Sequence, residues 1–412
     1  MSTPLMHSHP SDPQAVARRT QRIVLAQFAI FGVAQAAWFA RMPATKARFE
    51  LTDSQFGTLL LVISIGALIG MVTSGAIVAS IGVRKTAYLG GGLLALGMGL
   101  SGIALAQLSI TILVAGFAVA GLAGALVNIP LNIAASISGK ELRKENLSQF
   151  HALYSVGSVA GSAAASVSAH AGISPAAHLI GLAVPCALVI VVLARQIPPP
   201  SPTNSADAGA SHGNRGPAKG ALTAWREKRT LRIGVLMFCG SLSEGAANSW
   251  LALALMTGLD VSEATGALAL SVFTAAMTAG RFAGPWVIGR LGRVRTVVVT
   301  GCVALMGLVG VITAPTVTLA FAGAVAWGLG AALSGPVAIS AAADDPLHAP
   351  ARVAMASAFG AAAQIATPPV FGALANVIGA RPMLGTISIG LLATLGLSKS
   401  VAPDSRTPGM DG

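Results

Sequence analysis

The sequence predicts an all-α membrane protein whose helices form two pseudo-symmetric bundles of six. Three observations lead to this fold class: an apolar composition, apolar runs long enough to cross a bilayer, and an internal repeat. Of the 412 residues, 54% are hydrophobic and only 10% are charged. A soluble monomer of this size needs more charged surface than that. The 48 glycines suit helices in lipid, where small residues let backbones pack closely.

Long apolar segments recur along the whole chain. A helix needs roughly 20 residues, at about 1.5 Å of rise each, to cross the hydrocarbon core of a bilayer. Twelve segments are expected to do so: 21–41, 55–80, 86–106, 109–136, 149–171, 175–194, 230–257, 263–289, 296–314, 317–343, 352–377 and 381–400.

The polar segments around these spans divide the chain into domains. Residues 1–20 are expected to form a disordered cytoplasmic tail, before a first span that is retained as a signal anchor. Residues 195–229 are rich in Pro, Gly, Ser and Ala and predict a flexible cytoplasmic linker. The linker separates an N-terminal bundle, 21–194, from a C-terminal bundle, 230–400, which a cytoplasmic tail at 401–412 follows.

The net charge of +12 is explained by membrane topology and not by a nucleic-acid partner. Lysine and arginine are concentrated in segments expected on the cytoplasmic side: Arg18, Arg19, Arg22, Arg84, Lys85, Lys140, Arg143, Lys144, Arg226, Lys228, Arg229, Arg293 and Arg295. The opposite side carries only Arg41, Lys46, Arg48 and Arg381. This asymmetry follows the positive-inside rule, so we expect a multi-pass protein of the cell membrane with both termini in the cytoplasm. The cluster at 41–48 is the one local exception.

No pattern in the sequence indicates a catalytic or metal site. Cys186, Cys239 and Cys302 lie in apolar runs on three separate spans, without metal-ligand or disulfide spacing. There is no nucleotide-binding loop, and no nucleophile has a base at a workable spacing. We therefore expect neither an enzyme nor an ATP-driven pump, and neither a cofactor nor a bound metal.

The two halves of the chain resemble each other at long period. GMVTSGAIVASIG at 70–82 matches GRFAGPWVIGRLG at 280–292, in the second span of each half. GLAGALVNIP at 121–130 matches GLGAALSGP at 328–336, in the fourth span of each half. Two six-span halves joined by a cytoplasmic linker are the plan of transporters that work by alternating access.

The loop after the second span carries a pattern of glycines and basic residues. Gly75, Gly82, Arg84 and Lys85 fit the signature G-x-L-a-D-r-x-G-r-k. With the two six-span halves, this pattern resembles the major facilitator superfamily over the whole chain apart from the tails. The acidic position of the signature holds Ala79, so the charge relay ascribed to this loop in the family is not implied here.

Finer motifs are similar to those of the branch that includes fucose-permease-like and related bacterial inner-membrane proteins. They are W-x-x-R-x-P at the end of the first span, F-H-x-x-x-S-x-G in the fifth, E-G-x-x-x-D-W in the seventh and G-R in the eighth. The matching residues are Trp38, Arg41, Pro43, Phe150, His151, Ser155, Gly157, Glu244, Gly245, Trp250, Gly280 and Arg281. The acidic position before Trp250 is not kept, and Asn248 lies nearby.

The resemblance implies a secondary transporter, monomeric in the lipid bilayer, that moves a small solute by alternating access. Proton coupling is our preferred mechanism, and the branch favours uptake of a sugar-like solute. Two alternatives stay open. One is an exporter of a hydrophobic metabolite or drug, and the other is a non-transporting membrane scaffold or sensor on the same fold.

Glu244 is the most informative residue of the chain, because it lies near the centre of the seventh span. A carboxylate at that depth costs at least about 2.5–3.5 kcal/mol on insertion scales, so it is expected to face protein or water. Arg281 lies at a similar depth in the eighth span, about 13 Å from its cytoplasmic end at helical rise. If Arg281 contacts Glu244 in one conformation and leaves it in another, Glu244 can take up and release protons. A permanent structural ion pair is the alternative.

Amide side chains are the other polar candidates for a substrate site. Asn248 follows Glu244 on one helical face. Gln35 lies on a stripe with Phe31 and Trp38 in the first span, and Asn128 and Asn132 lie one turn apart in the fourth. Aromatic rings beside amides suit a polyol or sugar ring, which stacks on one face and hydrogen-bonds through its hydroxyls. The alternative role is hydrogen bonding between helices, worth about 0.6 kcal/mol per bond in membranes.

The remaining candidates for the substrate or proton pathway lie on four different spans: His151, Trp250, Trp327 and Gln364. His151 titrates near neutral pH but lies near the cytoplasmic boundary, so we expect a gate or a structural hydrogen bond. Gly157-x-x-x-Gly161 in the fifth span predicts close helix packing. Asp344 and Asp345 follow the tenth span, where Arg352 or the basic loops could hold them as a gate.

Overall fold

A computed structural model of the chain describes residues 13–142, 147–197, 225–345 and 348–403. The regular secondary structure in these ranges is helical. The predictions for tail residues 1–12 and 404–412 and for linker residues 198–224 lie outside the described residues.

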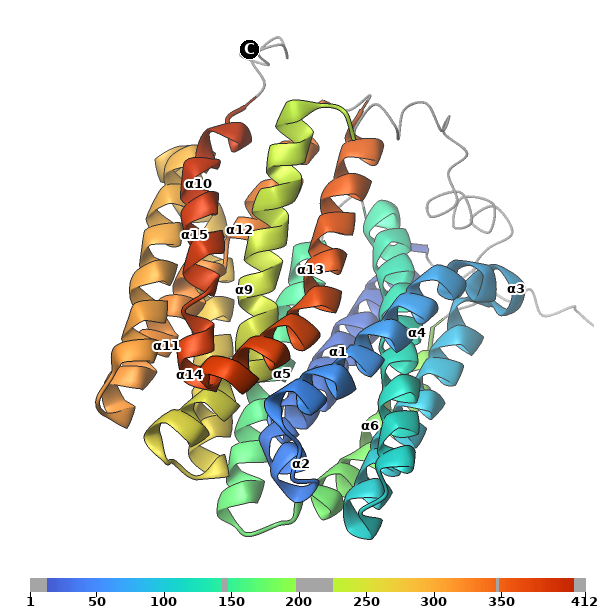
Figure 1. Cartoon of the computed structure of the whole chain (residues 1–412). Helices are drawn as coiled ribbons and strands as arrows, with labels where there is room; N and C mark the ends of the chain where they lie inside the picture. The colour runs from blue at the N-terminus through green and yellow to red at the C-terminus, as the bar shows by residue number, and fades with distance from the viewer. Residues whose placement is uncertain (1–12, 143–146, 198–224, 346–347, 404–412) are drawn as a thin grey trace, which may run out of the picture.

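The helices of the first half pack together (Figure 1). They are α1 (Pro13–Phe39), α2 (Met42–Arg48), α3 (Asp53–Gln107), α4 (Ile110–Glu141), α5 (Leu147–His170) and α6 (Pro175–Arg195). α1 begins at Pro13 and not at residue 21, so residues 13–20, expected in a disordered tail, are helical.

The second half forms a second group of helices. They are α9 (Lys228–Leu259), α10 (Glu263–Thr313), α11 (Val317–Ala331), α12 (Ser334–Ala342), α13 (Ala349–Ile378), α14 (Ala380–Leu384), α15 (Ile387–Gly396) and the 3₁₀ turn η1 (Ser398–Val401). The expected span 317–343 is divided between α11 and α12. The break sets Pro336 in the first turn of α12, where its missing N–H breaks no helical hydrogen bond. The expected span 381–400 is divided between α14, α15 and η1.

α3 and α10 each contain two spans joined at a glycine. Gly82 in α3 and Gly292 in α10 have φ angles of 81° and 71°, which L side chains rarely adopt. Each glycine is the last residue of a matching segment, 70–82 or 280–292, so the sequence repeat produces the same bend in both halves. With two arms each for α3 and α10, the described helices agree with the expected spans.

The outside of the molecule suits a bilayer. Seven of the described helices are long and apolar enough to cross a membrane by length and composition, among them α3 with 55 residues and α10 with 51. Large apolar side chains such as Val72, Val377 and Ile389 are exposed on the surface. Such a surface is normal against lipid and unfavourable in water.

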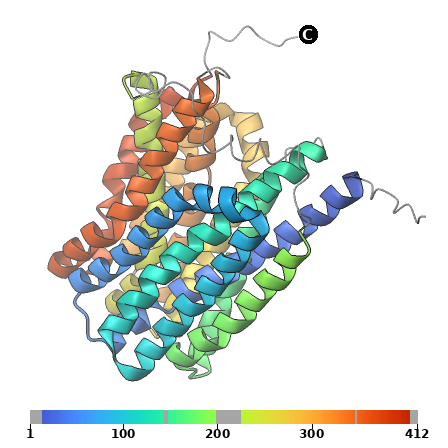
Figure 2. The same cartoon turned by 90° about the vertical axis from the view of Figure 1, so that its right-hand side faces the viewer.

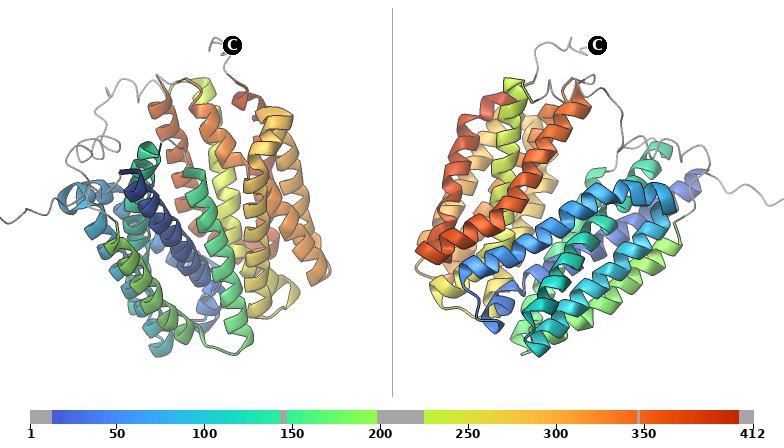
Figure 3. Two further views of the ribbon diagram at one scale, coloured as in Figure 1. Left: turned by 180° about the vertical axis from the view of Figure 1, so that it is seen from behind. Right: turned by 45° about the vertical axis from the view of Figure 1, so that its right-hand side comes forward.

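The two groups of helices form two bundles with a common pair of ends. We call α1 to α6 the N bundle, and α9 to α15 with η1 the C bundle. The basic end is the end at which α1 and α9 begin, and the far end is the end that carries α2 (Figures 1 and 2). The bundles meet at the far end and diverge toward the basic end (Figure 3).

Glycines set the distance between α1 and α5 in the N bundle. A Cβ atom at Gly157 would lie 1.9 Å from the carbonyl oxygen of Ala29, and one at Gly161 would lie 2.2 Å from that of Val33. Only glycine lets the two backbones approach this closely. The spacing Gly157-x-x-x-Gly161 therefore packs these two helices together.

Gly157→Ala should destabilise the protein, because the added methyl group must push α1 away from α5. We expect a loss of about 1–3 kcal/mol, the usual cost of overpacking, measured as a lower thermal unfolding temperature of the purified protein in detergent. Gly181→Ala in α6 is the control, since nothing lies within 4 Å of a Cβ at that position. Equal unfolding temperatures for the two variants would contradict the predicted crowding.

Candidate functional site

An ion pair lies midway along α9 and the first arm of α10. Nη2 of Arg281 donates to Oε2 of Glu244 at 3.0 Å. We call these two residues the central pair. Their side chains are 30% (Glu244) and 31% (Arg281) exposed. The structure thus brings together the acid and the base that the sequence placed at one depth, and it leaves both accessible.

The central pair faces the N bundle. The phenol of Tyr154 in α5 lies within electrostatic range of both Glu244 and Arg281. The Tyr154 ring also contacts Phe31 of α1, with ring centroids 5.7 Å apart. Tyr154 therefore connects the charges of one bundle with the aromatic stripe of the other.

Tyr154 was not among the residues that sequence reasoning singled out for the site. The signal that points to it is a phenol within an apolar span, one of only two tyrosines in the chain. A tyrosine hydroxyl in such surroundings usually has a polar partner.

Three amide side chains continue this surface on the N bundle. A Cβ at Gly124 of α4 would lie 3.5 Å from Nε2 of Gln35 and 4.0 Å from Cζ of Phe31, so both α1 side chains lie against α4. Asn128 follows one turn later on α4 and accepts a hydrogen bond of 2.9 Å from Nδ2 of Asn132. Asn132 also donates to the main-chain oxygen of Asn128, so its hydrogen bonds run within α4 and not between helices.

α13 adds an amide on the other side of Glu244. Nε2 of Gln364 donates to the carbonyl oxygen of Ser241 in α9 at 3.3 Å. A Cβ built at Gly245 would lie 2.8 Å from the side-chain oxygen of Gln364. Asn248, one turn beyond Glu244, is half-buried. Gln364 is exposed and lies close enough to Glu244 to belong to the same surface.

The three tryptophans predicted for the pathway are buried in helix packing. Trp38 packs edge-on against a phenylalanine of α4 in the N bundle. Trp250 packs edge-on against Phe56 of α3, in a contact between the two bundles. Trp327 donates from its indole N–H to Oγ of Ser243 at 2.8 Å. Each indole is at most 1% exposed, so in this state no tryptophan of the three offers its ring to a solute.

His151 lies in the first turns of α5, near the basic end. Its side chain is outside the described residues, and its role as a gate or structural hydrogen-bonding group stays a prediction.

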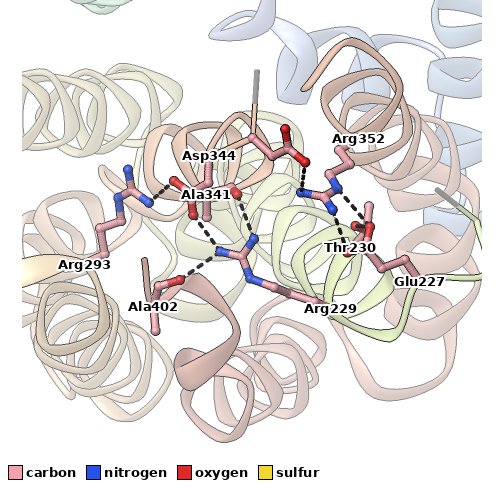
Figure 4. A network of polar contacts seen from close by, with 9 residues as sticks. Glu227, Arg229, Thr230, Arg293, Ala341, Asp344, Arg352 and Ala402 are labelled. Atoms are coloured by element: carbon pink, nitrogen blue, oxygen red, sulfur yellow. Dashed lines mark hydrogen bonds and ion pairs between the residues drawn. The ribbon is translucent and has the colours of Figure 1, made fainter. Parts of the chain in front are cut away.

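A separate network of charges holds the basic end of the C bundle together (Figure 4). Asp344, which follows α12, accepts from Arg229 of α9 at 2.7 Å and from Arg293 of α10 at 2.5 Å. Arg352 of α13 binds Glu227 through two hydrogen bonds of 2.8 Å each. These residues all belong to the C bundle. The basic loops do hold Asp344, as the sequence suggested, but the network braces one bundle.

The bundles touch each other directly at the far end. Nε of Arg41, which follows α1, lies 3.2 Å from Oε1 of Glu263 in α10. Gly57 of α3 lies against α13 so closely that a Cβ there would be 2.4 Å from the carbonyl oxygen of Pro368. This end of the molecule is therefore closed.

The central pair, the amides and the Tyr154 ring form one site of mixed chemistry, whereas Phe31 is 4% exposed and packs against Tyr154. The site combines two opposite charges, amide groups that donate and accept hydrogen bonds, and an aromatic ring. The groups that form it come from both bundles, so a relative movement of the bundles changes the site.

Comparison with known proteins identifies the family of this chain. The model of the Major Facilitator Superfamily matches residues 23–356. An uncharacterized MFS-type transporter of Yersinia pestis is 29% identical over 376 residues, which covers 91% of this chain and 94% of that protein.

Two solved structures are similar in fold. The E. coli fucose:proton symporter FucP has a TM-score of 0.63 at 14% identity, with 93% of this chain and 98% of that chain covered. The nucleoside transporter NupG has a TM-score of 0.70 at 11% identity, with 94% and 98% covered. Since the family match extends over most of its length, this chain belongs to the major facilitator superfamily.

Proposed function

We propose that this protein moves a small hydroxylated solute, sugar-like in its chemistry, by alternating access, and that protons bound at Glu244 drive the movement. Membership of the superfamily makes it a transporter and not an enzyme. The class of solute and the coupling to protons are the proposal.

The central pair carries the proposal. A charged side chain at mid-membrane costs at least about 2.5–3.5 kcal/mol, and such residues are kept where they have a partner or a use. Glu244 and Arg281 have each other as partners, and about a third of each side chain remains exposed. A pair that is partly open stays within reach of water and of a solute. This exposure therefore supports a pair that takes part in binding.

The same pair supplies a mechanism for proton coupling. While Arg281 lies against Glu244, the ionised carboxylate is stabilised. When a bound solute draws the guanidinium away, the carboxylate loses the charge that stabilises its ionised form and can take up a proton. Proton uptake is then coupled to the binding of solute.

The side chains around the central pair favour a hydroxylated ring as the solute. Tyr154 is half-buried and offers a ring face on which a sugar ring can stack, and the buried Phe31 packs against that ring from α1. Gln35, Asn128 and Gln364 offer amide groups that both donate and accept hydrogen bonds. Two proteins of similar fold are described as a fucose:proton symporter and a nucleoside transporter, and both of these solutes contain a hydroxylated ring.

In this proposal the basic end lies in the cytoplasm of a cell-membrane protein. The positive-inside rule assigns it so, because Arg84, Arg229 and Arg293 are at that end. The bundles meet at the far end and diverge at the basic end, so we assign this structure to the state that is open toward the cytoplasm.

A solute screen in proteoliposomes tests the proposal. Purified protein is reconstituted, a pH gradient is imposed, and labelled hexoses, deoxyhexoses, polyols, nucleosides and hydrophobic drugs are offered in turn. We expect a hydroxylated solute to accumulate and a protonophore to abolish its accumulation. Flux of hydrophobic compounds alone would replace the proposal with the export alternative.

Glu244→Gln should abolish accumulation against the gradient and spare exchange of solute. The amide keeps the shape of the carboxyl group and one oxygen that can accept from Arg281, but it cannot take up a proton. Uptake under a pH gradient and counterflow without one measure the two activities in the same vesicles. Wild-type accumulation in this variant would defeat the coupling through Glu244.

Arg281→Ala should lose transport, because it leaves the Glu244 carboxylate without its counter-charge at mid-membrane. Adding Glu244→Gln to this variant removes the unpaired charge and should restore part of the exchange activity. A double variant as inactive as Arg281→Ala alone would mean that the two residues act separately.

Tyr154→Phe should raise the KM for solute by about three- to tenfold, which corresponds to the loss of one hydrogen bond. Tyr88→Phe in α3 is the matched control, since Tyr88 is the other tyrosine of the chain. Initial uptake rates over a range of solute concentrations give the KM. If both variants keep the parental value, Tyr154 does not bind the solute through its hydroxyl.

A further inference from the structure

An arginine at the far end departs from the charge distribution of the rest of the chain. Arg41 lies just beyond α1, on the side where basic residues are few. Its side chain is 1% exposed, although arginine is almost never fully buried unless it is paired. The location of its acidic partner therefore indicates the role of this buried charge.

The acidic partner of Arg41 belongs to the other bundle. Nε of Arg41 lies 3.2 Å from Oε1 of Glu263, the first residue of α10. Nη2 of the same guanidinium donates to the carbonyl oxygen of Ile173, between α5 and α6. Arg41 is thus held to the N bundle by one nitrogen and reaches the C bundle with another.

The Arg41 side chain of this pair is buried, whereas the Glu263 side chain is 23% exposed. A buried cluster drawn from both bundles lies at the same end: Ala40, Ala165, Ala267 and Leu270. Beside it, Oγ of Ser166 in α5 donates to the carbonyl oxygen of Ala264 in α10 at 2.8 Å. In such low-dielectric surroundings a paired charge is strongly held and an unpaired one is costly.

We propose that Arg41 and Glu263, the far-end pair, hold the far end closed and separate each time that end opens. The inference rests on the proposed alternating-access cycle, in which the bundles part at the far end. On parting, Arg41 keeps its bond to Ile173, while Glu263 moves away with the C bundle.

The far-end pair differs in this respect from the central pair. Glu244 and Arg281 are on the same bundle, so a rigid tilt of the bundles does not by itself separate them. Arg41 and Glu263 are on different bundles, so any opening at the far end lengthens their distance. The far-end pair therefore contributes to the balance between the two states, and it accounts for Arg41 within the local exception to the charge rule.

Arginine suits this task better than lysine. Its planar fork presents several N–H groups in fixed directions, whereas lysine is a single point charge on a flexible stem. In Arg41 one nitrogen of the fork holds the Ile173 carbonyl while another faces the Glu263 carboxylate.

Cysteine labelling of the far end tests the proposal. Cys186, Cys239 and Cys302 are replaced by alanine, and Ala267→Cys places a thiol at a site with 0% exposure between the bundles. The purified full chain in detergent is reacted with a soluble maleimide, so that both ends are reachable whatever the orientation in the membrane. Adding Glu263→Gln should raise the labelling rate at least about tenfold, because the open state gains population.

Two further variants keep the result decisive. Arg41→Lys keeps the charge but loses the fork, and should give a labelling rate between those of the parent and Glu263→Gln. Asp53→Asn is the control, since it breaks the 3.1 Å Lys46–Asp53 pair at the same end but within the N bundle, and should leave the rate unchanged.

Parental labelling rates in both Glu263→Gln and Arg41→Lys would overturn the proposal, with thermal unfolding of each variant confirming that it is folded. Labelling needs no solute, so a failed solute screen leaves this test intact. If transport is proton-driven but the labelling rates do not change, the role proposed for the far-end pair is wrong and the proposed function still stands.

Discussion

The structure depends on one constraint, which is that a charge in an apolar slab must have a partner or reach water. The chain has few charges, and three groups of them within or close to its helices are paired. Glu244 has Arg281 at mid-membrane, Arg41 has Glu263 at the far end, and Asp344 has two arginines at the basic end. Apolar contacts, many of them between small residues, set the distance between helices. They do not by themselves determine which arrangement of the two bundles is preferred.

The three sets of charges differ in how they relate to the bundles. The network around Asp344 and the central pair lie within the C bundle, whereas Arg41 and Glu263 belong to different bundles. A movement of one bundle against the other therefore leaves the first two intact and strains the third. Tyr154 is the exception on the N bundle, because its phenol lies near the central pair and changes its surroundings when the bundles move.

Much of the fold could be predicted from the sequence, because hydrophobic length and an internal repeat determine it. The repeat even located the bends at Gly82 and Gly292. The approach of Glu244 and Arg281 followed from depth alone, since two charges at one level of adjacent antiparallel helices lie close together. The helix break at 385–386 was not foreseen, because apolar composition continues through it.

The rest of the site depends on how each helix is rotated about its axis, which an evenly apolar helix does not reveal. For this reason the sequence placed Trp38, Trp250 and Trp327 in the pathway, whereas the structure packs all three out of reach. The same uncertainty hid Tyr154 and the partner of Arg41. Glu263 lies far from Arg41 in the sequence, and only the contact between the bundles brings the two together.

The brace around Asp344 has a mechanical consequence. It ties α9, the bend of α10 and the stretch after η1 into one stiff end, because Arg229 also donates to the carbonyl oxygen of Ala402 at 2.8 Å. A stiff bundle that pivots at the opposite end acts as a lever. Its tip then sweeps further than its middle, so a small displacement at the level of Glu244 produces a much wider mouth where the solute enters or leaves.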